Sequence, residues 1–181
     1  MARVELLTAE RAPLLARPYY EGGDPGPIAA ALANVPELLE VTLPLLGRVY
    51  GPTSVDPRLK EIVVLRVSVR AGCRYCVATH TVAAWDAGVT EAETAALHGS
   101  GQGLGEREAA LVEWCDEIAR CGDAVGDEAI AQLHAHFAEH EIVELTLLAG
   151  ATVMLNRFCT ALQLEPSPAT VERLASAGAY P

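Results

Sequence analysis

Two cysteines and two acid–base residues lie near one another in the sequence, at spacings that suit redox chemistry. Cys73 and Cys76 are separated by two residues, His80 follows four residues after Cys76, and Glu61 lies twelve residues before Cys73. On a helix of about 3.6 residues per turn, positions 73, 76 and 80 share one face. The two sulfurs can therefore meet, with the imidazole one turn beyond the second.

Thiols in this arrangement have a defined chemistry. The start of a helix carries partial positive charge and favours a thiolate over a thiol, and a nearby imidazole can take the proton. Such a thiolate attacks a peroxide oxygen or a disulfide sulfur, and the partner thiol closes an intramolecular disulfide. Arg70 and Arg74 lie close in sequence and can add to the effect, whereas Glu61 can accept a proton there only if its helix packs against the cysteine helix.

Two other interpretations of the same residues stay open at the sequence level. Cys73, Cys76, His80 and Glu61 could ligate a structural metal, although the sequence offers no second Cys/His pair at the usual zinc spacing. The thiols could also be inert and buried in a non-catalytic, oligomeric helical protein. We expect Cys115, Cys121 and Cys159 to be inert, because they lie among apolar neighbours.

The segments that position these residues are predicted to be helical. Residues 58–70 are rich in β-branched side chains, but Asp56 and Pro57 form a helix start and no second strand is available for pairing. Thr90 and Glu93 form a capping-box pattern for a helix that ends at His98. The further expected helices are 36–50 with a kink at Pro44, 73–87, 106–120, 127–137, 141–164 and one that starts at Ser167 and Pro168.

These segments predict an all-α fold, a compact bundle of about seven helices with no sheet. Residues 1–34 are expected to form an N-terminal arm, in which the turn-rich segment 18–27 is too rich in proline and glycine for regular helix. Residues 35–181 are expected to form a single helical domain, with the chemical motif between residues 57 and 97.

Charge and hydropathy limit the kinds of partner and the cellular location that we expect for this chain. The chain of 181 residues has 24 acidic and 13 basic side chains, a formal net charge of −11. We expect the chain to bind neither nucleic acid nor an anionic membrane surface, because both kinds of binding need clustered Lys and Arg. The uncharged stretch 145–156 is too short to span a bilayer, and Glu5, Glu10 and Arg11 interrupt any leader sequence, so we expect a cytoplasmic protein.

The pattern of Glu61, Cys73, Cys76 and His80 resembles the alkylhydroperoxidase D (AhpD)-like branch of the carboxymuconolactone decarboxylase (CMD) superfamily. The resemblance is strongest over residues 57–97, and a weaker echo is the late helix that contains Asn156 and Arg157. It implies an all-helical, homo-oligomeric oxidoreductase that reduces alkyl hydroperoxides, a peroxiredoxin-type activity, without metal, flavin or haem. The electron donor it implies is a dithiol, such as dihydrolipoamide, or a reductase protein.

The resemblance also implies roles within the site. Cys76 would attack the peroxide, Cys73 would resolve the product, and Glu61 and His80 would form a proton relay. Proximity to the helix N-terminus by itself favours Cys73 as the more acidic thiol. The sequence departs from the founding peroxidases, which carry a second histidine between the two cysteines, because Arg74 and Tyr75 stand there.

Overall fold

The described residues of this computed structural model, 1–120, 122 and 125–179, form helices and connecting loops with no strand among them. The all-α prediction is confirmed, although this described part of the chain contains ten helices where about seven were expected. The elements are the 3₁₀ helix η1 (Leu14–Tyr20) and the α-helices α1 (Pro27–Leu32), α2 (Pro36–Tyr50), α3 (Pro57–Ala71), α4 (Arg74–Asp86), α5 (Glu91–His98), α6 (Glu106–Arg120), α7 (Asp127–His136), α8 (Glu139–Leu162) and α9 (Pro168–Ser176).

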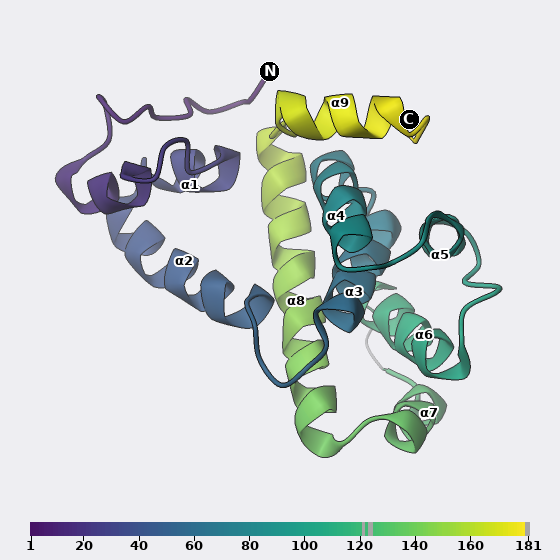
Figure 1. The fold of residues 1–181 in the computed structure, drawn as a ribbon. Helices are drawn as coiled ribbons and strands as arrows, with labels where there is room; N and C mark the ends of the chain where they lie inside the picture. The colour runs from purple at the N-terminus through teal and green to yellow at the C-terminus, as the bar shows by residue number, and fades with distance from the viewer. Residues whose placement is uncertain (121, 123–124, 180–181) are drawn as a thin grey trace.

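The two helices that correspond to no predicted segment, η1 and α1, lie in the expected N-terminal arm. Element η1 extends into the predicted turn-rich segment as far as Tyr20. This 3₁₀ helix contains Pro18 near its end. It packs on α2 through a small apolar cluster that contains Ala16, Ala33 and Leu39. The arm is therefore folded against the second helix rather than extended, as Figure 1 shows.

Helix α3 lies at the centre of the fold and packs against α4, α6 and α8 (Figure 1). It is a helix, as expected, and its β-branched run is buried on several sides because neighbours surround it. Two charged side chains on α3 are also buried and paired. Arg66 donates two hydrogen bonds to the carboxylate of Asp116 on α6, at 2.6 and 2.7 Å, and Lys60 pairs with Glu144 on α8 at 2.7 Å.

Helix α8 is the second central element. By length and composition it is the one helix among the described residues that could cross a membrane, a test that the core helix of a soluble protein also passes. In this structure α8 packs against α2, α3, α4 and α6, and its residues Leu145, Leu148 and Ala149 are fully buried. Its position agrees with the helix expected over residues 141–164.

Candidate active site

The junction between α3 and α4 places the first cysteine. Gly72 ends α3 in the left-handed conformation at φ 67°, a region that glycine adopts without steric cost. The Cys73 N–H then donates to the Ser68 carbonyl at 3.1 Å, which closes the helix end. Cys73 is therefore the N-cap of α4 rather than its first helical residue, and its sulfur accepts a hydrogen bond from the Cys76 N–H at 3.4 Å.

The predicted acid–base pair is assembled beside the thiols. Because α4 packs on α3, His80 Nδ1 lies 2.9 Å from Glu61 Oε2, and both side chains are about one-fifth exposed, at 22% and 20%. Among the described side chains, His80 makes no hydrogen bond to either thiol. Four residues separate His80 from Cys76 on the same helix, so the two lie one turn apart.

Tyr50 is a neighbour of this pair that the sequence did not indicate. Its ring lies 6.1 Å from the His80 ring, and its hydroxyl is 2.9 Å from Thr152 Oγ1 on α8. Burial raises the pKa of Tyr50, and the charges of Cys76, Cys159 and Glu61 add to that effect. The phenol therefore stays protonated.

Cys159 is the second residue that the sequence did not assign to the site. It lies in the last turn of α8, forms one buried cluster with Cys73, Cys76 and Leu164, and affects the pKa of both motif thiols. The prediction that Cys159 is buried is confirmed, but its neighbours are the two motif sulfurs rather than apolar side chains alone. A residue 86 positions from Cys73 in sequence gives no local signal of this contact.

The three thiols have unequal affinities for a proton. Hydrogen bonds donated by Cys159 and Cys76 lower the pKa of Cys73, with a further contribution from the Cys76 N–H, against the opposing effect of burial. Hydrogen bonds to Cys159 and Cys73, together with burial, raise the pKa of Cys76, and the bond to Cys73 raises that of Cys159. The backbone N–H of Cys76, which donates to the Cys73 sulfur at 3.4 Å at the start of α4, favours a thiolate on Cys73 in the same direction.

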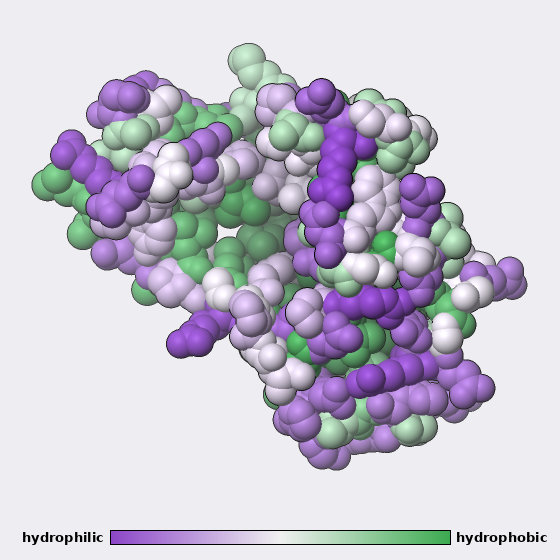
Figure 2. Space-filling model, viewed as in Figure 1, coloured by the Kyte–Doolittle hydropathy of each residue, from purple (hydrophilic) through white to green (hydrophobic). Residues whose placement is uncertain are grey.

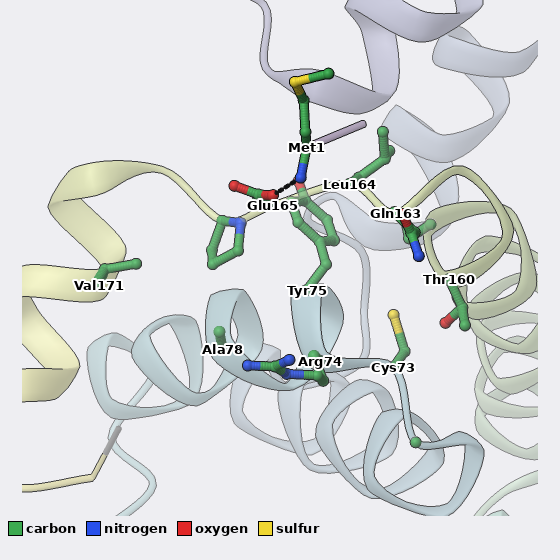
Figure 3. A pocket seen from close by; sticks show the side chains of 13 residues that line it. Met1, Cys73, Arg74, Tyr75, Ala78, Thr160, Gln163, Leu164, Glu165 and Val171 are labelled. Carbon is green, nitrogen blue, oxygen red and sulfur yellow. Dashed lines mark hydrogen bonds and ion pairs between the residues drawn. The ribbon is translucent and has the colours of Figure 1, made fainter. Parts of the chain in front are cut away.

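A cavity of about 530 Å³ opens onto Cys73. It lies where the start of α4 meets the end of α8 and the first residues of the chain, and Figure 3 shows the Cys73 sulfur near Thr160 and Gln163. Cys76 is not part of the lining. The lining residues are Met1, Gly72, Cys73, Arg74, Tyr75, Ala78, Cys159, Thr160, Gln163, Leu164, Glu165, Pro166 and Val171.

Two arginines and two further cysteines complete the set of residues that the sequence singled out. Arg74 lines the cavity, whereas Arg70 points toward Asp116 at 3.5 Å. Cys115 is fully buried in the main core on α6, and Cys121 lies outside the described residues. Among the residues that the structure describes, no three His, Cys, Asp or Glu side chains are arranged to hold a metal ion.

Comparison with known proteins identifies a family segment and a fold. Residues 36–117 match the carboxymuconolactone decarboxylase family. An uncharacterized protein of Bacillus subtilis, YdfG, is 27% identical over 113 residues, which cover 61% of this chain and 77% of that protein.

Two solved structures share the fold. One is a protein of unknown function from Agrobacterium tumefaciens, proposed to be the antioxidant defence protein AhpD, with a TM-score of 0.70 and 25% identity over 75% of this chain and 94% of that one. The other is the debrominase Bmp8 in complex with 2,3,4-tribromopyrrole, with a TM-score of 0.82 and 18% identity over 97% of both chains. At 18% identity, the second likeness is a likeness of fold alone. The resemblance predicted from the sequence is confirmed by the family match and the first of these structures.

Proposed function

We propose that this chain, whose residues 36–117 match the carboxymuconolactone decarboxylase family, reduces organic hydroperoxides with the Cys73–Cys76 pair. The observation that carries the proposal is the environment of Cys73. Its sulfur caps the N-terminus of α4, accepts hydrogen bonds from the Cys76 N–H and the neighbouring thiols, and lines a cavity. A stabilised thiolate that faces a cavity is what attack on a peroxide oxygen requires.

The first step forms a sulfenic acid on Cys73. The thiolate attacks one peroxide oxygen, the O–O bond breaks, and the alkoxide leaves and takes up a proton to become an alcohol. The sulfur is oxidised by two electrons and the peroxide is reduced by the same two. Arg74 is the arginine among the described residues of the cavity wall, and its guanidinium can stabilise the charge that develops on the departing oxygen.

The second step forms the disulfide. Cys76 attacks the sulfur of the sulfenic acid, the S–S bond forms, and hydroxide leaves with a proton as water. Because its pKa is raised, the Cys76 thiol needs a base, and the His80–Glu61 pair one turn away supplies it. This division of labour gives Cys73 the attacking role and Cys76 the resolving role, the reverse of the assignment that the family resemblance implied.

A dithiol returns the pair to the reduced state by thiol–disulfide exchange. Dihydrolipoamide or a reductase protein is the donor that we propose, and such donors work in a reducing compartment such as the cytoplasm. The cavity at Cys73 is the point of entry for both the peroxide and a slender dithiol. The cycle uses the thiols alone, with no cofactor.

We also propose that the working form is a homo-oligomer. Exposed apolar side chains gather on α2 and α8, which contact one another, and Figure 2 shows apolar surface between these two helices. The residues are Leu38, Val41 and Leu45 on α2 and Val143, Leu147 and Met154 on α8. A second copy of the chain that covers this surface would remove it from water.

The proposal is tested by peroxide-dependent oxidation of dihydrolipoamide, with tert-butyl hydroperoxide as the oxidant. We expect the wild type to turn over, and Cys73→Ser and Cys76→Ser each to lose turnover, while Cys115→Ser keeps the wild-type rate. Elemental analysis of protein prepared without chelator tests the rival structural-metal interpretation. About one zinc per chain, with loss of the fold on chelation, would support that rival and contradict the redox proposal.

A further inference from the structure

A second cavity, of about 320 Å³, lies between the N-terminal arm, α2 and the start of α4, and we call it the arm pocket. None of the described residues that line it is charged. The cavity at Cys73 differs in this respect, because Arg74 and Glu165 are among its lining residues. The side chains that make the arm pocket apolar are Tyr19, Ile28, Ala29, Leu43, Leu46 and Tyr75.

Two side chains connect the arm pocket to the thiols. Tyr75 lines both cavities, and Figure 3 shows its side chain extending from α4 along the cavity at Cys73. Ile28 on α1 lines the arm pocket, and both Ile28 and Tyr75 pack against the buried cluster that contains Cys73 and Cys76. One layer of side chains therefore separates the arm pocket from the thiols, and the two cavities meet at Tyr75.

The size and the walls of the arm pocket indicate the class of group that it can hold. An apolar cavity of about 150 Å³ binds benzene. The arm pocket, at about 320 Å³, therefore has room for a phenyl ring with a branched alkyl substituent. Tyr19 and Tyr75 supply aromatic rings to its wall, and an aromatic ring packs favourably against others in stacked or edge-to-face contact. Hydrogen peroxide has no apolar group and gains nothing from such walls.

The arm pocket lies on a different side of α2 from the surface proposed for self-association. Leu43 and Leu46 line the pocket, whereas Leu38, Val41 and Leu45 are exposed. At about 3.6 residues per turn, the two sets lie on average about 140° apart around the helix. A second copy of the chain on the exposed set would therefore contact the other side of α2 from the arm pocket.

We propose that the arm pocket binds the aromatic group of an aryl-substituted alkyl hydroperoxide, an inference that rests on the proposed peroxidase function. The ring lies between the arm and α2, and the peroxide group extends past Tyr75 toward the Cys73–Cys76 pair. The inference requires only that the hydroperoxide reaches this pair, and it holds whichever of the two cysteines attacks. The preferred substrates are those that carry a phenyl ring on the carbon that bears the hydroperoxide, as cumene hydroperoxide does.

Binding is tested with 2-phenyl-2-propanol, the unreactive alcohol that forms when cumene hydroperoxide is reduced, in a ligand-observed NMR titration. Leu43→Trp fills part of the pocket and should weaken binding by at least about tenfold, because even one methylene in an apolar pocket changes discrimination by about 10- to 200-fold. Leu43→Ala cannot clash, and it should also weaken binding because it removes part of the wall. Leu14→Trp adds the same side chain at an exposed residue of η1 outside the pocket, and it should bind the alcohol as the wild type does.

The kinetic counterpart compares kcat/KM for cumene hydroperoxide with kcat/KM for hydrogen peroxide, with dihydrolipoamide as the electron donor. In Leu43→Trp, the value for cumene hydroperoxide should fall by at least about tenfold relative to that for hydrogen peroxide. The value for hydrogen peroxide should match the wild type, because that substrate has no group to place in the arm pocket. Leu14→Trp should leave both values unchanged.

Two results would overturn the inference. In one, both Leu43 variants bind 2-phenyl-2-propanol as tightly as the wild type does. In the other, both variants keep the wild-type ratio of the two kcat/KM values. Failure of the wild type to reduce either peroxide would instead refute the peroxidase proposal, and the titration with the alcohol would still decide whether the arm pocket binds an aromatic group.

Discussion

At the scale of single residues, the proposed chemistry depends on the protonation state of Cys73. Hydrogen bonds from Cys159 and Cys76 favour the thiolate, so the pKa of Cys73 falls below the usual value of about 8.5 for a free cysteine. We expect the thiolate absorbance near 240 nm to appear below that pH as the native protein is titrated. The part of the thiolate absorbance that appears below that pH should be absent from Cys73→Ser.

The contribution of the Cys159 thiol to the pKa of Cys73 can be measured by removing that thiol. Replacing Cys159 with alanine removes a hydrogen bond to the charged form, so the pKa of Cys73 should rise and the thiolate signal should move to higher pH. Cys115→Ala is the matched control, since that thiol is buried away from the cluster. An unchanged titration in Cys159→Ala would show that the third thiol does not stabilise the charge.

The acid–base pair should affect resolution more than attack. Glu61→Gln keeps the shape of the side chain but removes the charge that orients His80, and His80→Ala removes the base itself. Each change should slow disulfide formation by about 10²- to 10⁴-fold while the sulfenic acid accumulates. Stopped-flow kinetics with a dimedone quench separates the two steps, and equal slowing of peroxide consumption would instead favour Cys76 as the attacking thiol.

The sequence predicted the four local members of the site and missed two distant ones. Helical periodicity places Cys73, Cys76 and His80 on one face, and the short connection through Gly72 makes the contact with Glu61 plausible. Nothing local relates Cys159 to Cys73, because their contact depends on how α8 crosses α4. The roles of the thiols likewise depend on hydrogen bonds that only the folded cluster provides.

At the scale of the helices, the turn at Gly72 determines where Cys73 lies. A Cβ added at Gly72 would meet no atom within 4 Å, so the cost of Gly72→Ala comes from the left-handed backbone alone. We expect a loss of about 1–2 kcal/mol in the free energy of unfolding, measured by urea denaturation, and slower peroxide reduction as Cys73 shifts.

Gly47→Ala is the matched control for this change. Gly47 is an exposed residue inside α2, about half a turn around the helix from the exposed apolar side chains, and a Cβ there also meets nothing within 4 Å. Alanine in a helix interior is favoured over glycine by about 0.5–1 kcal/mol, so this variant should be stabilised with an unchanged rate. If Gly72→Ala were as stable and as active as Gly47→Ala, the turn would have no part in placing the thiol.

Most helix boundaries were predictable because their caps are local. Asp56 caps α3 with Pro57 at its first position, and the capping box of Thr90 and Glu93 is present at α5 as expected. The two N-terminal helices η1 and α1 were not expected, since each is short, contains proline and depends on packing around α2. The strand-like composition of α3 reflects its burial among three helices rather than its local conformation.

At the scale of the whole molecule, the exposed apolar surface of α2 and α8 predicts self-association. Val41 and Leu147 are 64% and 56% exposed, so their replacement by glutamate should cost the isolated chain little. We expect light scattering to give a mass above 19.1 kDa for the wild type and a smaller mass for Val41→Glu and Leu147→Glu. Leu14→Glu, which changes the more exposed residue Leu14 on η1, is the control. A wild-type monomer at micromolar concentration would contradict the prediction.

The proposed peroxidase cycle depends on one bond, the disulfide between Cys73 and Cys76. Its most direct test is a tryptic map of the reduced wild type after one equivalent of tert-butyl hydroperoxide, with free thiols alkylated before digestion. We predict that peptide 71–74 becomes joined to peptide 75–107 as the peroxide is consumed, and that dihydrolipoamide reverses the link. If both peptides are instead recovered fully alkylated and the peroxide persists, the pair is not redox-active and the proposed function is wrong.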